Sequence, residues 1–347
     1  MSGVQLVKIA AAEADQRLDR WLKKRFPQLT QIRIEKACRK GEIRVDGGRV
    51  KPALRLAEGQ EVRVPPLPPA EPAPAQTTRP RISDADAQMM ERAVLYRDDT
   101  LIAINKPPGL PSQGGSKQGE RHVDGLSASL AFGGETPRLV HRLDKDTSGV
   151  MLLARTAKAA RALSQAFRAR ETRKIYWAAV AGAPKPAMGT IRYGLVKAAG
   201  HGRGGEGEKM RAVHPDAVRE TPDAKHAVTD YAVLSSLAGR TAWVALVPVT
   251  GRTHQLRAHM AEFGHPIIGD GKYGGSSQEN LGDGWGAGMG GISRKLHLHA
   301  RHLSLRHPET GALLRLTAPL PEHMAKTWDL LEWRASDVPV DPFEAEE

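Results

Sequence analysis

The 347-residue chain contains a single cysteine, so an internal disulfide is impossible. That scarcity suits a protein of the reducing cytoplasm, which is the location we expect. Cys38 follows Ala37 in a helical pattern, and we expect it to be a small buried residue. Long apolar runs are missing too, so no transmembrane helix is predicted. The first residues lack the apolar core of a signal peptide.

Acidic residues are too few to balance the basic ones. The 51 Lys and Arg residues against 39 Asp and Glu give a formal net charge of +12 and a pI near 9.9. Hydrophobic content of 40% and charged content of 26% are otherwise those of a globular protein. The length allows two domains. The positive excess favours a polyanionic partner, either a nucleic acid or an acidic membrane surface.

Residues 12–64 are predicted to form a small separate module. Asp15 is placed to cap a first amphipathic helix, and Thr30 to cap a second one that ends at Gly41. Short strands should follow, with Asp46-Gly47 as a hairpin signal. The patterns RLDRWL and IRIEKACRKGEIRVDG resemble an S4 RNA-binding domain.

More than half of the charge excess lies in this module. Up to residue 64 there are 15 Lys and Arg against 8 Asp and Glu, a net charge of +7. Eight basic residues fall on the two predicted helices, where they could contact RNA phosphates: Arg17, Arg20, Lys23, Lys24, Arg33, Lys36, Arg39 and Lys40. A solvated helical face is the plainer alternative, but the charges there are of one sign rather than mixed.

The rest of the chain divides by composition. Residues 65–90 are expected to be a linker that begins with an extended Pro/Ala-rich stretch. Residues 91–334 alternate between strand and helix patterns and should form the larger domain. Gly-rich segments at 199–208 and 274–291 are expected to be loops. The acidic tail, residues 335–347, is expected to be disordered.

The most informative stretch is HRLDKDTSG, residues 141–149, which precedes the apolar run VMLLA. Charged residues at the mouth of a buried strand could grip an anionic ligand and present one carboxylate to it. A charged loop before a core strand is the plainer alternative. The stretch resembles the catalytic motif of the RluA-type pseudouridine synthases, which isomerise uridine in structured RNA. NKPPGLPSQGG, GRTHQLRAH and GHPIIGDGKYG resemble further blocks of that family, in family order.

The resemblance implies roles for individual residues. Asp144 matches the catalytic carboxylate, and Arg257 matches the arginine that pairs with it. Tyr176 matches a tyrosine in a K-x-Y-x-A setting. Arg142 matches the side chain that fills the place of the flipped nucleotide. The residues expected to contact RNA in these blocks are His141, Arg142, Arg252, His254 and Gln255.

The implied fold is α+β. An S4-like (α-L) module would precede a catalytic domain with a long, mixed, mainly antiparallel β-sheet flanked by helices and loops. The implied activity is pseudouridine synthesis in 23S large-subunit rRNA or its precursor, by a monomer without cofactor or metal. An S4 module with HRLDKDTSGV favours the multi-site large-subunit branch over the branch that acts on the bridge stem-loop. A tRNA-modifying synthase and a non-catalytic RNA-binding assembly factor remain alternatives.

Two other chemistries compete for the same residues. Asp146-Thr147-Ser148-Gly149 looks like an aspartic-protease triplet, but a bilobal protease needs two copies and only one is present. His254 and His259 are five residues apart, about 140° around a helix, and so do not share a face. His297 and His299 share a strand face without a Cys or carboxylate beside them. Hydrogen-bonded or RNA-facing histidines are therefore favoured over a metal site.

Overall fold

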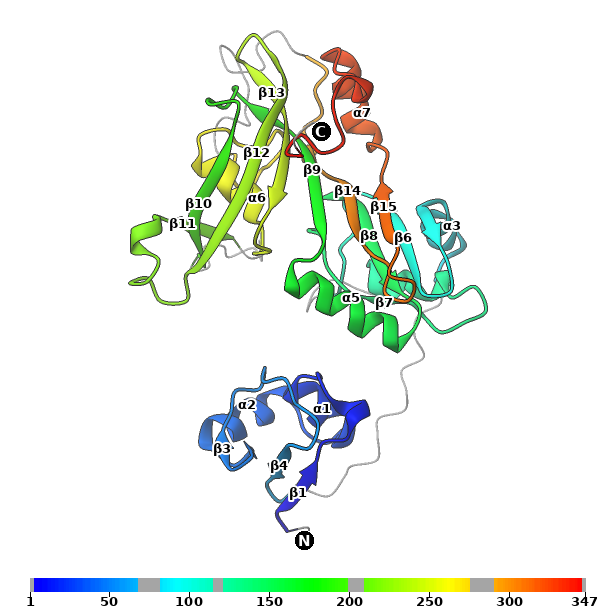
Figure 1. Cartoon of the computed structure of the whole chain (residues 1–347), viewed down its shortest axis with the longest axis vertical. Helices are drawn as coiled ribbons and strands as arrows, with labels where there is room; N and C mark the ends of the chain where they lie inside the picture. The colour runs from blue at the N-terminus through cyan, green and yellow to red at the C-terminus, as the bar shows by residue number, and fades with distance from the viewer. Residues whose placement is uncertain (1–2, 68–81, 115–120, 199–208, 275–289, 345–347) are drawn as a thin grey trace. The chain divides into compact units, whose positions relative to one another are not determined.

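The computed structural model describes residues 3–67, 82–114, 121–198, 209–274 and 290–344. The chain divides into two compact units, Met1–Pro80 and Arg81–Glu347, which Figure 1 draws in blue and in cyan to red. Most of the Pro/Ala-rich stretch and of the two Gly-rich segments lies outside the described residues. None of the described helices combines the length and apolar composition that a membrane span requires.

The first unit packs two helices on a four-stranded sheet of order β1-β4-β2-β3. Its elements are β1 Gln5–Lys8, a 3-10 turn Ala11–Glu13, α1 Leu18–Arg25, α2 Gln31–Lys40, β2 Arg44–Val45, β3 Gly48–Arg49 and β4 Glu61–Val64. Because β1 pairs with β4, the module begins before residue 12. Thr30 caps α2 through the Arg33 N–H (3.3 Å), and Gly41 ends it in the left-handed conformation, as predicted.

One predicted cap in this unit is wrong. The residue before α1 is Arg17, which makes no side-chain cap. Asp15 instead adopts a positive φ of 61° two residues earlier, where its oxygen contacts Arg55. The apolar faces are as expected: Trp21 and Cys38 are buried in the core between the helices and the sheet.

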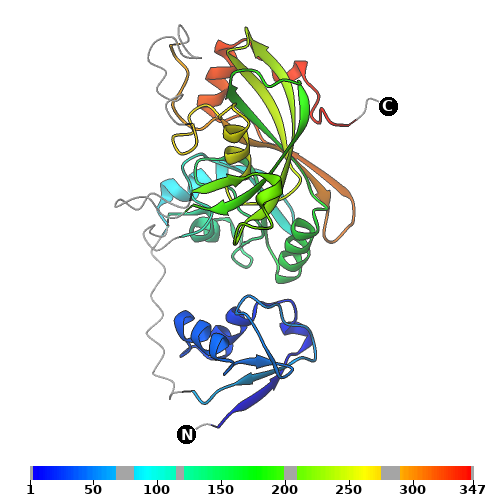
Figure 2. The same cartoon turned by 90° about the vertical axis from the view of Figure 1, so that its left-hand side faces the viewer.

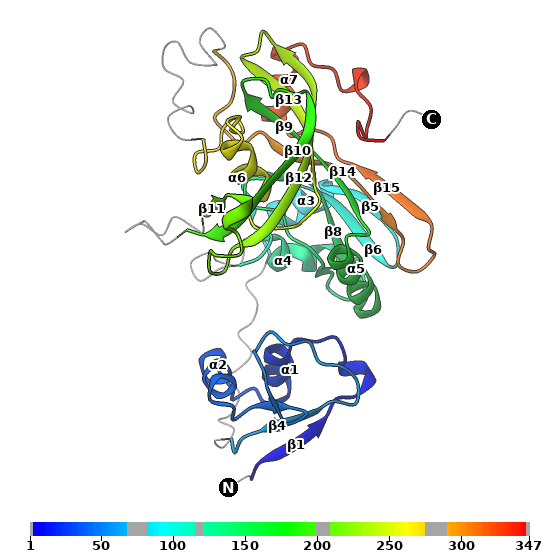
Figure 3. The same cartoon turned by 60° about the vertical axis from the view of Figure 1, so that its left-hand side comes forward.

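The second unit is built on an eleven-stranded sheet of order β11-β10-β12-β13-β9-β14-β8-β6-β5, with β15 paired to β14 and β7 to β8. Its strands are β5 Val94–Arg97, β6 Leu101–Lys106, β7 Arg138–Leu139, β8 Ser148–Ala154, β9 Arg173–Ala181, β10 Met188–Lys197, β11 Met210–Val213, β12 Lys225–Leu237, β13 Thr241–Pro248, β14 Leu298–Arg306 and β15 Leu313–Thr317. Among the described strand pairs, only β14 with β8 is parallel. The sheet is thus mixed and mainly antiparallel, as predicted. Figures 2 and 3 show the β14–β15 hairpin in orange, and its turn contacts the loop between β5 and β6 through His307 Nε2 and Asp98 Oδ2 (2.9 Å).

Helices cover both faces of this sheet. They are α3 Asp84–Arg92, α4 Val123–Leu126, α5 Ala157–Ala169, α6 Gln255–Glu262 and α7 Glu322–Leu330, with 3-10 turns Ser127–Leu130, Pro215–Ala217 and Ala335–Asp337. The side chains of β13 alternate: Val244 and Leu246 pack with α6, whereas Trp243 packs with α7. Figure 3 shows α6 beside β10 and β11.

Two apolar clusters meet on one face of the sheet. The first lies under α6, and the second joins β6 and β8 to α3 and α4. Tyr176 of β9 packs against both clusters. This junction brings the loop before β8 close to α6, although the two segments are more than 100 residues apart in sequence.

Two boundaries of the sequence analysis need correction. Helix α3 begins within the expected linker, but it buries Met90 in the core of the second unit, which therefore begins before residue 91. The expected disordered tail is folded as far as residue 344. Asp341 accepts two hydrogen bonds from Arg173 (2.6 and 2.8 Å), and Phe343 packs into the cluster around α7. An acidic composition could not reveal this arginine partner on β9.

Candidate active site

The loop carrying Asp144 is fixed on both sides of that residue. Before it, the side chain of Leu143 is buried. The backbone N–H of Leu143 donates to Ser112 Oγ (3.0 Å), and the Ser112 hydroxyl donates to the Leu143 carbonyl (2.6 Å). After it, Gly149 has a φ of +113°, and a Cβ there would fall on the backbone of Ala300. Glycine is therefore required where the loop enters β8.

Lys106 ties the loop to the turn after β6. Its fully buried Nζ donates to the carbonyls of Pro107 (2.9 Å), Leu110 (2.8 Å) and Lys145 (3.0 Å). Burial lowers the pKa of Lys106 to about 7, and the carboxylates of Asp146 and Asp144 act in the opposite direction. Three carbonyls match the three donors of an ammonium group. The NKPPG block thus braces the backbone next to Asp144.

Arg257 projects from α6 to Asp144, but its main partner is another carboxylate. Its Nε and Nη2 donate to Asp270 at 2.7 and 2.8 Å, whereas its Nη1 lies 3.5 Å from Asp144 Oδ2. Although burial lowers the pKa of Arg257, the hydrogen bonds and charge of Asp270 raise it overall. The predicted proximity of Arg257 and Asp144 is found, but the pair of hydrogen bonds from the Arg257 guanidinium goes to Asp270.

Sequence reasoning gave Asp270 no role. It lies in GHPIIGDGKYG, and it also accepts hydrogen bonds from the N–H groups of Lys272 (3.1 Å) and Tyr273 (3.2 Å). Gly269 before it has a φ of +76°, and a Cβ there would fall on the Lys295 carbonyl. In the sequence, Asp270 could have been noticed as a carboxylate next to a glycine in this block. Only the fold shows that its partner is Arg257.

His254 lies on the same side of Asp144 as Arg257. Its Nε2 is 3.8 Å from Asp144 Oδ2, and its Nδ1 is 2.8 Å from Tyr273 Oη. The Tyr273 ring also lies against the guanidinium of Arg257, 5.2 Å from ring centroid to Cζ. Burial lowers the pKa of His254, Asp144 opposes that change, and Arg257 adds to it. His254 therefore belongs to the candidate site.

Tyr176 approaches the site from β9. The ring is half-buried at the junction of the two apolar clusters. Burial raises the pKa of its hydroxyl, and the negative charge of Asp144 raises it further. The structure thus brings Asp144, Tyr176 and Arg257 together, as the resemblance implied.

Two of the residues expected to contact RNA are used inside the protein instead. His141 stacks on Phe167 with 4.2 Å between ring centroids, and its Nε2 accepts the Leu152 N–H (2.9 Å). Burial lowers the pKa of His141 to about 3, so the ring is neutral. His141 holds the loop against β8, because its imidazole accepts a hydrogen bond from Leu152 of that strand.

Gln255 is likewise structural. Its amide nitrogen donates to Val228 O (2.9 Å) and Thr229 Oγ1 (3.0 Å). Its oxygen accepts from Thr250 Oγ1 (2.6 Å) and the Arg252 N–H (3.1 Å). These contacts use the full hydrogen-bonding capacity of the amide. Gln255 therefore clamps the turn that precedes α6.

The remaining expected contact residues do reach the surface. Arg142, two residues before Asp144, is exposed. Arg252 is half-buried, and its Nε donates to the His226 carbonyl (3.2 Å). Arg252 also borders a pocket of about 580 Å³ whose wall includes Arg170 and Lys174. Basic residues thus line this second pocket.

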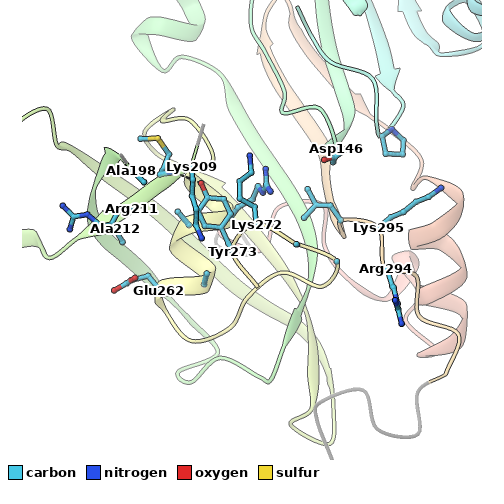
Figure 4. Close-up of a pocket in the computed structure, with 18 of the residues that line it drawn as sticks. Asp146, Ala198, Lys209, Arg211, Ala212, Glu262, Lys272, Tyr273, Arg294 and Lys295 are labelled. Carbon is cyan, nitrogen blue, oxygen red and sulfur yellow. Dashed lines mark hydrogen bonds between the residues drawn. The ribbon is translucent and has the colours of Figure 1, made fainter. Parts of the chain in front are cut away.

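A larger cavity, of about 1340 Å³, opens beside Arg257 and Tyr273. Its wall carries six further basic residues against Asp146 and Glu262: Lys197, Lys209, Arg211, Lys272, Arg294 and Lys295. Figure 4 shows Tyr273 beside Lys209 and Lys272, with Asp146 and Lys295 across the opening. The cavity is suited to an anionic ligand of nucleic-acid size.

Two of the histidines considered for a metal site, His297 and His299, make hydrogen bonds within the protein, as the sequence favoured. His297 contacts Thr327 Oγ1 (2.8 Å), and His299 contacts Ser148 Oγ (2.8 Å) and the Ala318 carbonyl (3.1 Å). His259 is buried, and neither ring nitrogen has a hydrogen-bond partner among the described residues. In the described parts of the chain, no three His, Cys, Asp or Glu side chains are grouped to hold a metal ion.

Comparison with known proteins agrees with this geometry. The profile of the RNA pseudouridylate synthase family matches residues 100–262, and the S4 domain profile matches residues 16–62. Ribosomal large subunit pseudouridine synthase C of Salmonella typhi is 35% identical over 332 residues, 96% of this chain and 98% of that protein. The protein of that name from Escherichia coli K12 is 35% identical over 93% of this chain and 95% of its own.

Solved structures give the same assignment. Human RNA Pseudouridylate Synthase Domain Containing 4 is similar with a TM-score of 0.58 and 33% identity, over 71% of this chain and 95% of that one. Human RNA Pseudouridylate Synthase Domain Containing 1 has a TM-score of 0.51 and 26% identity, over 67% of this chain and 86% of its own. With an S4 domain followed by a synthase domain, and relatives matched along nearly its whole length, this chain belongs to the RNA pseudouridylate synthase family.

Proposed function

We propose that this protein converts specific uridines of large-subunit ribosomal RNA to pseudouridine. The observation that carries the proposal is Asp144, held beside Arg257 and His254, with Tyr176 nearby at the junction of the two apolar clusters. The names of the bacterial relatives support the choice of RNA. A ribosomal substrate and the single cysteine also favour a cytoplasmic location.

Asp144 is the catalytic carboxylate in this proposal. The reaction breaks the N1–C1′ bond of a uridine, turns the freed base and rejoins it through C5. A carboxylate suits a sugar centre that gains positive character, because it can attack C1′ or remove a nearby proton. Arg257 keeps a positive charge 3.5 Å from Oδ2, where it can orient the carboxylate.

Tyr176 lies against the uracil in this proposal and helps to remove the C5 proton. A stacked base cannot reach a half-buried tyrosine, so the target nucleotide must leave the RNA helix. The exposed Arg142 is suited to fill the place that the nucleotide leaves. Because the reaction is an isomerisation, it requires no redox carrier.

The basic cavity and the S4 domain hold the RNA around that nucleotide. The cavity borders Arg257, and its six basic side chains can contact phosphates on one side of the flipped uridine. The exposed basic residues of α1 and α2 add contacts to other phosphates of the RNA. Such contacts increase affinity with little dependence on base sequence.

Tritium release tests the reaction directly. Large-subunit rRNA transcripts labelled at uracil C5 should lose tritium to water on incubation with the protein, because C5 becomes the glycosidic carbon. Pseudouridine mapping in ribosomal RNA from a deletion strain would then identify the sites. No release from rRNA, together with release from tRNA, would contradict the proposed substrate. No release from either RNA would contradict the activity.

A further inference from the structure

The contacts to Asp144 from α6 and from the turn before it converge on one oxygen. Arg257 Nη1 lies 3.5 Å from Oδ2, and His254 Nε2 lies 3.8 Å from the same atom. Among the described residues, no hydrogen bond or ion pair to Oδ1 is found. The contacts to the carboxylate are thus on Oδ2, which leaves Oδ1 available to a ligand.

The hydrogen bonds of Tyr273 favour one tautomer of His254. Tyr273 Oη accepts the backbone N–H of Met210 (2.8 Å) and lies 2.8 Å from His254 Nδ1. The single phenolic proton is then available to donate to Nδ1. A neutral imidazole has one N–H, so in this arrangement the proton of His254 lies on Nε2, the nitrogen that faces Asp144.

The backbone of His254 supports a functional role. Its φ is 51°, in the left-handed region that a residue with a side chain rarely adopts. The turn is maintained by Gln255, whose oxygen accepts the Thr250 hydroxyl and the Arg252 N–H. Such conformations cost free energy and concentrate at functional sites. Here the conformation directs the imidazole between Tyr273 and Asp144.

We propose that Tyr273 and His254 are positioning residues for the isomerisation. Tyr273 fixes the tautomer in which His254 Nε2–H points at Asp144 Oδ2, and His254 with Arg257 orients Oδ1 toward the sugar of the flipped uridine. The distance of 3.8 Å is longer than a hydrogen bond, so the contact closes when RNA fills the site. This inference rests on the proposed pseudouridine synthase function of the site.

The tautomer can be tested without any activity measurement. The intact protein, labelled with 15N-histidine, is compared by NMR with the His254→Gln variant, which identifies the His254 signals. We expect a protonated Nε2 and an unprotonated Nδ1 in the unmodified protein. In Tyr273→Phe, Nδ1 loses its donor and the signals should shift toward a tautomer mixture. A proton on Nδ1 in the unmodified protein would overturn the inference.

A double-mutant cycle tests the consequence for the reaction. Tyr273→Phe keeps the ring that lies against Arg257 and removes only the hydroxyl. We expect its single-turnover rate to fall about tenfold with saturating rRNA, while the Kd for RNA changes less than about twofold. His254→Gln replaces Nε2–H with an amide N–H that needs no tautomer control. It should retain more activity than His254→Ala.

The decisive comparison is Tyr273→Phe in the His254→Gln background. The inference predicts little further loss there, because the amide needs no help from the hydroxyl. An equal loss in both backgrounds would assign the hydroxyl a structural role through Met210 and overturn the inference. A rate unchanged by Tyr273→Phe alone would do the same. Absence of tritium release from the unmodified protein would instead refute the proposed function, whatever the NMR result.

Discussion

The two units of this protein use positive charge in different ways. The eight basic residues of the first unit that were predicted to contact RNA, seven on α1 and α2 and Arg17 just before α1, are all exposed. In the catalytic unit, the Arg257 side chain is only 8% exposed and is bound to Asp270, whose side chain is fully buried. The basic side chains of the first unit are in contact with solvent, whereas the guanidinium of Arg257 is held in place by the Asp270 carboxylate.

This difference indicates that the first unit contributes to RNA affinity, whereas the buried charges position groups at the site. Exposed lysines and arginines neutralise phosphates and release counterions, so they strengthen binding in a salt-dependent way without a fixed orientation. A buried arginine must have its charge compensated, and a bidentate carboxylate fixes its position while doing so. We therefore expect changes in the first unit to alter RNA binding, and changes around Asp144 to alter the reaction rate.

The largest effect should come from Asp144→Asn. The substitution keeps the shape of the side chain and removes its charge, so the single-turnover rate should fall at least about a thousandfold. RNA affinity should remain close to that of the unmodified protein. Tritium release and filter binding measure the two quantities. Asp99→Asn, at a fully exposed carboxylate of the same unit, is the matched control and should retain activity. Substantial turnover by the Asn variant would exclude Asp144 as the catalytic group.

Deletion of residues 1–80 should have the opposite effect: RNA binding should weaken while the reaction rate at saturating RNA is largely retained. This segment forms its own compact unit with its own core, so its removal leaves the catalytic unit intact. We expect binding at low salt to weaken at least about a hundredfold, and the log–log salt dependence to become less steep by several units. Saturating RNA should restore most of the single-turnover rate. Affinity and salt dependence equal to those of the full chain would mean that the unit has another task, such as binding a protein.

Arg257→Lys should lower the rate while changing affinity little. Lysine keeps the charge but loses the planar fork that binds Asp270 through two nitrogens and still reaches Asp144. We expect a fall of at least about tenfold in the single-turnover rate, equivalent to about 1.4 kcal/mol of barrier. Arg306→Lys, at an exposed arginine of β14, controls for the general effect of the exchange. An unchanged rate would show that the charge alone is sufficient.

The smallest effect distinguishes two basic residues within the first unit. Arg17 is paired with Asp19 through contacts of 2.6 and 3.0 Å, whereas Lys36 has no acidic partner within 4 Å among the described residues. Lys36→Gln should therefore reduce the salt slope of RNA binding by about 0.7 to 0.9, and Arg17→Gln by less. Equal changes would show that the pair with Asp19 opens when RNA binds.

Sequence patterns were reliable where structure depends on neighbours in the chain. Thr30 and Gly41 delimit α2 as predicted, because a cap needs only residues within one turn. Asp15 shows the limit of the same rule, since its backbone follows the path of the chain toward Arg55 rather than the start of the helix. The acidic tail was wrongly expected to be disordered because its partner, Arg173, lies far away in sequence.

For the site, the sequence by itself determined the blocks that resemble the family, and this resemblance predicted Asp144, Tyr176 and Arg257 as a group. Only the tertiary structure decided which partners the charged and polar side chains of the site have. It gives the two-pronged contact of Arg257 to Asp270, turns His141 and Gln255 inward, and connects His254 to Tyr273. Each of these assignments depends on donor and acceptor atoms meeting within about 3 Å, and hydrogen bonds lose their strength beyond that distance. Motif spacing along a chain cannot specify such distances between separate elements, because they are set by how the sheet and α6 pack together.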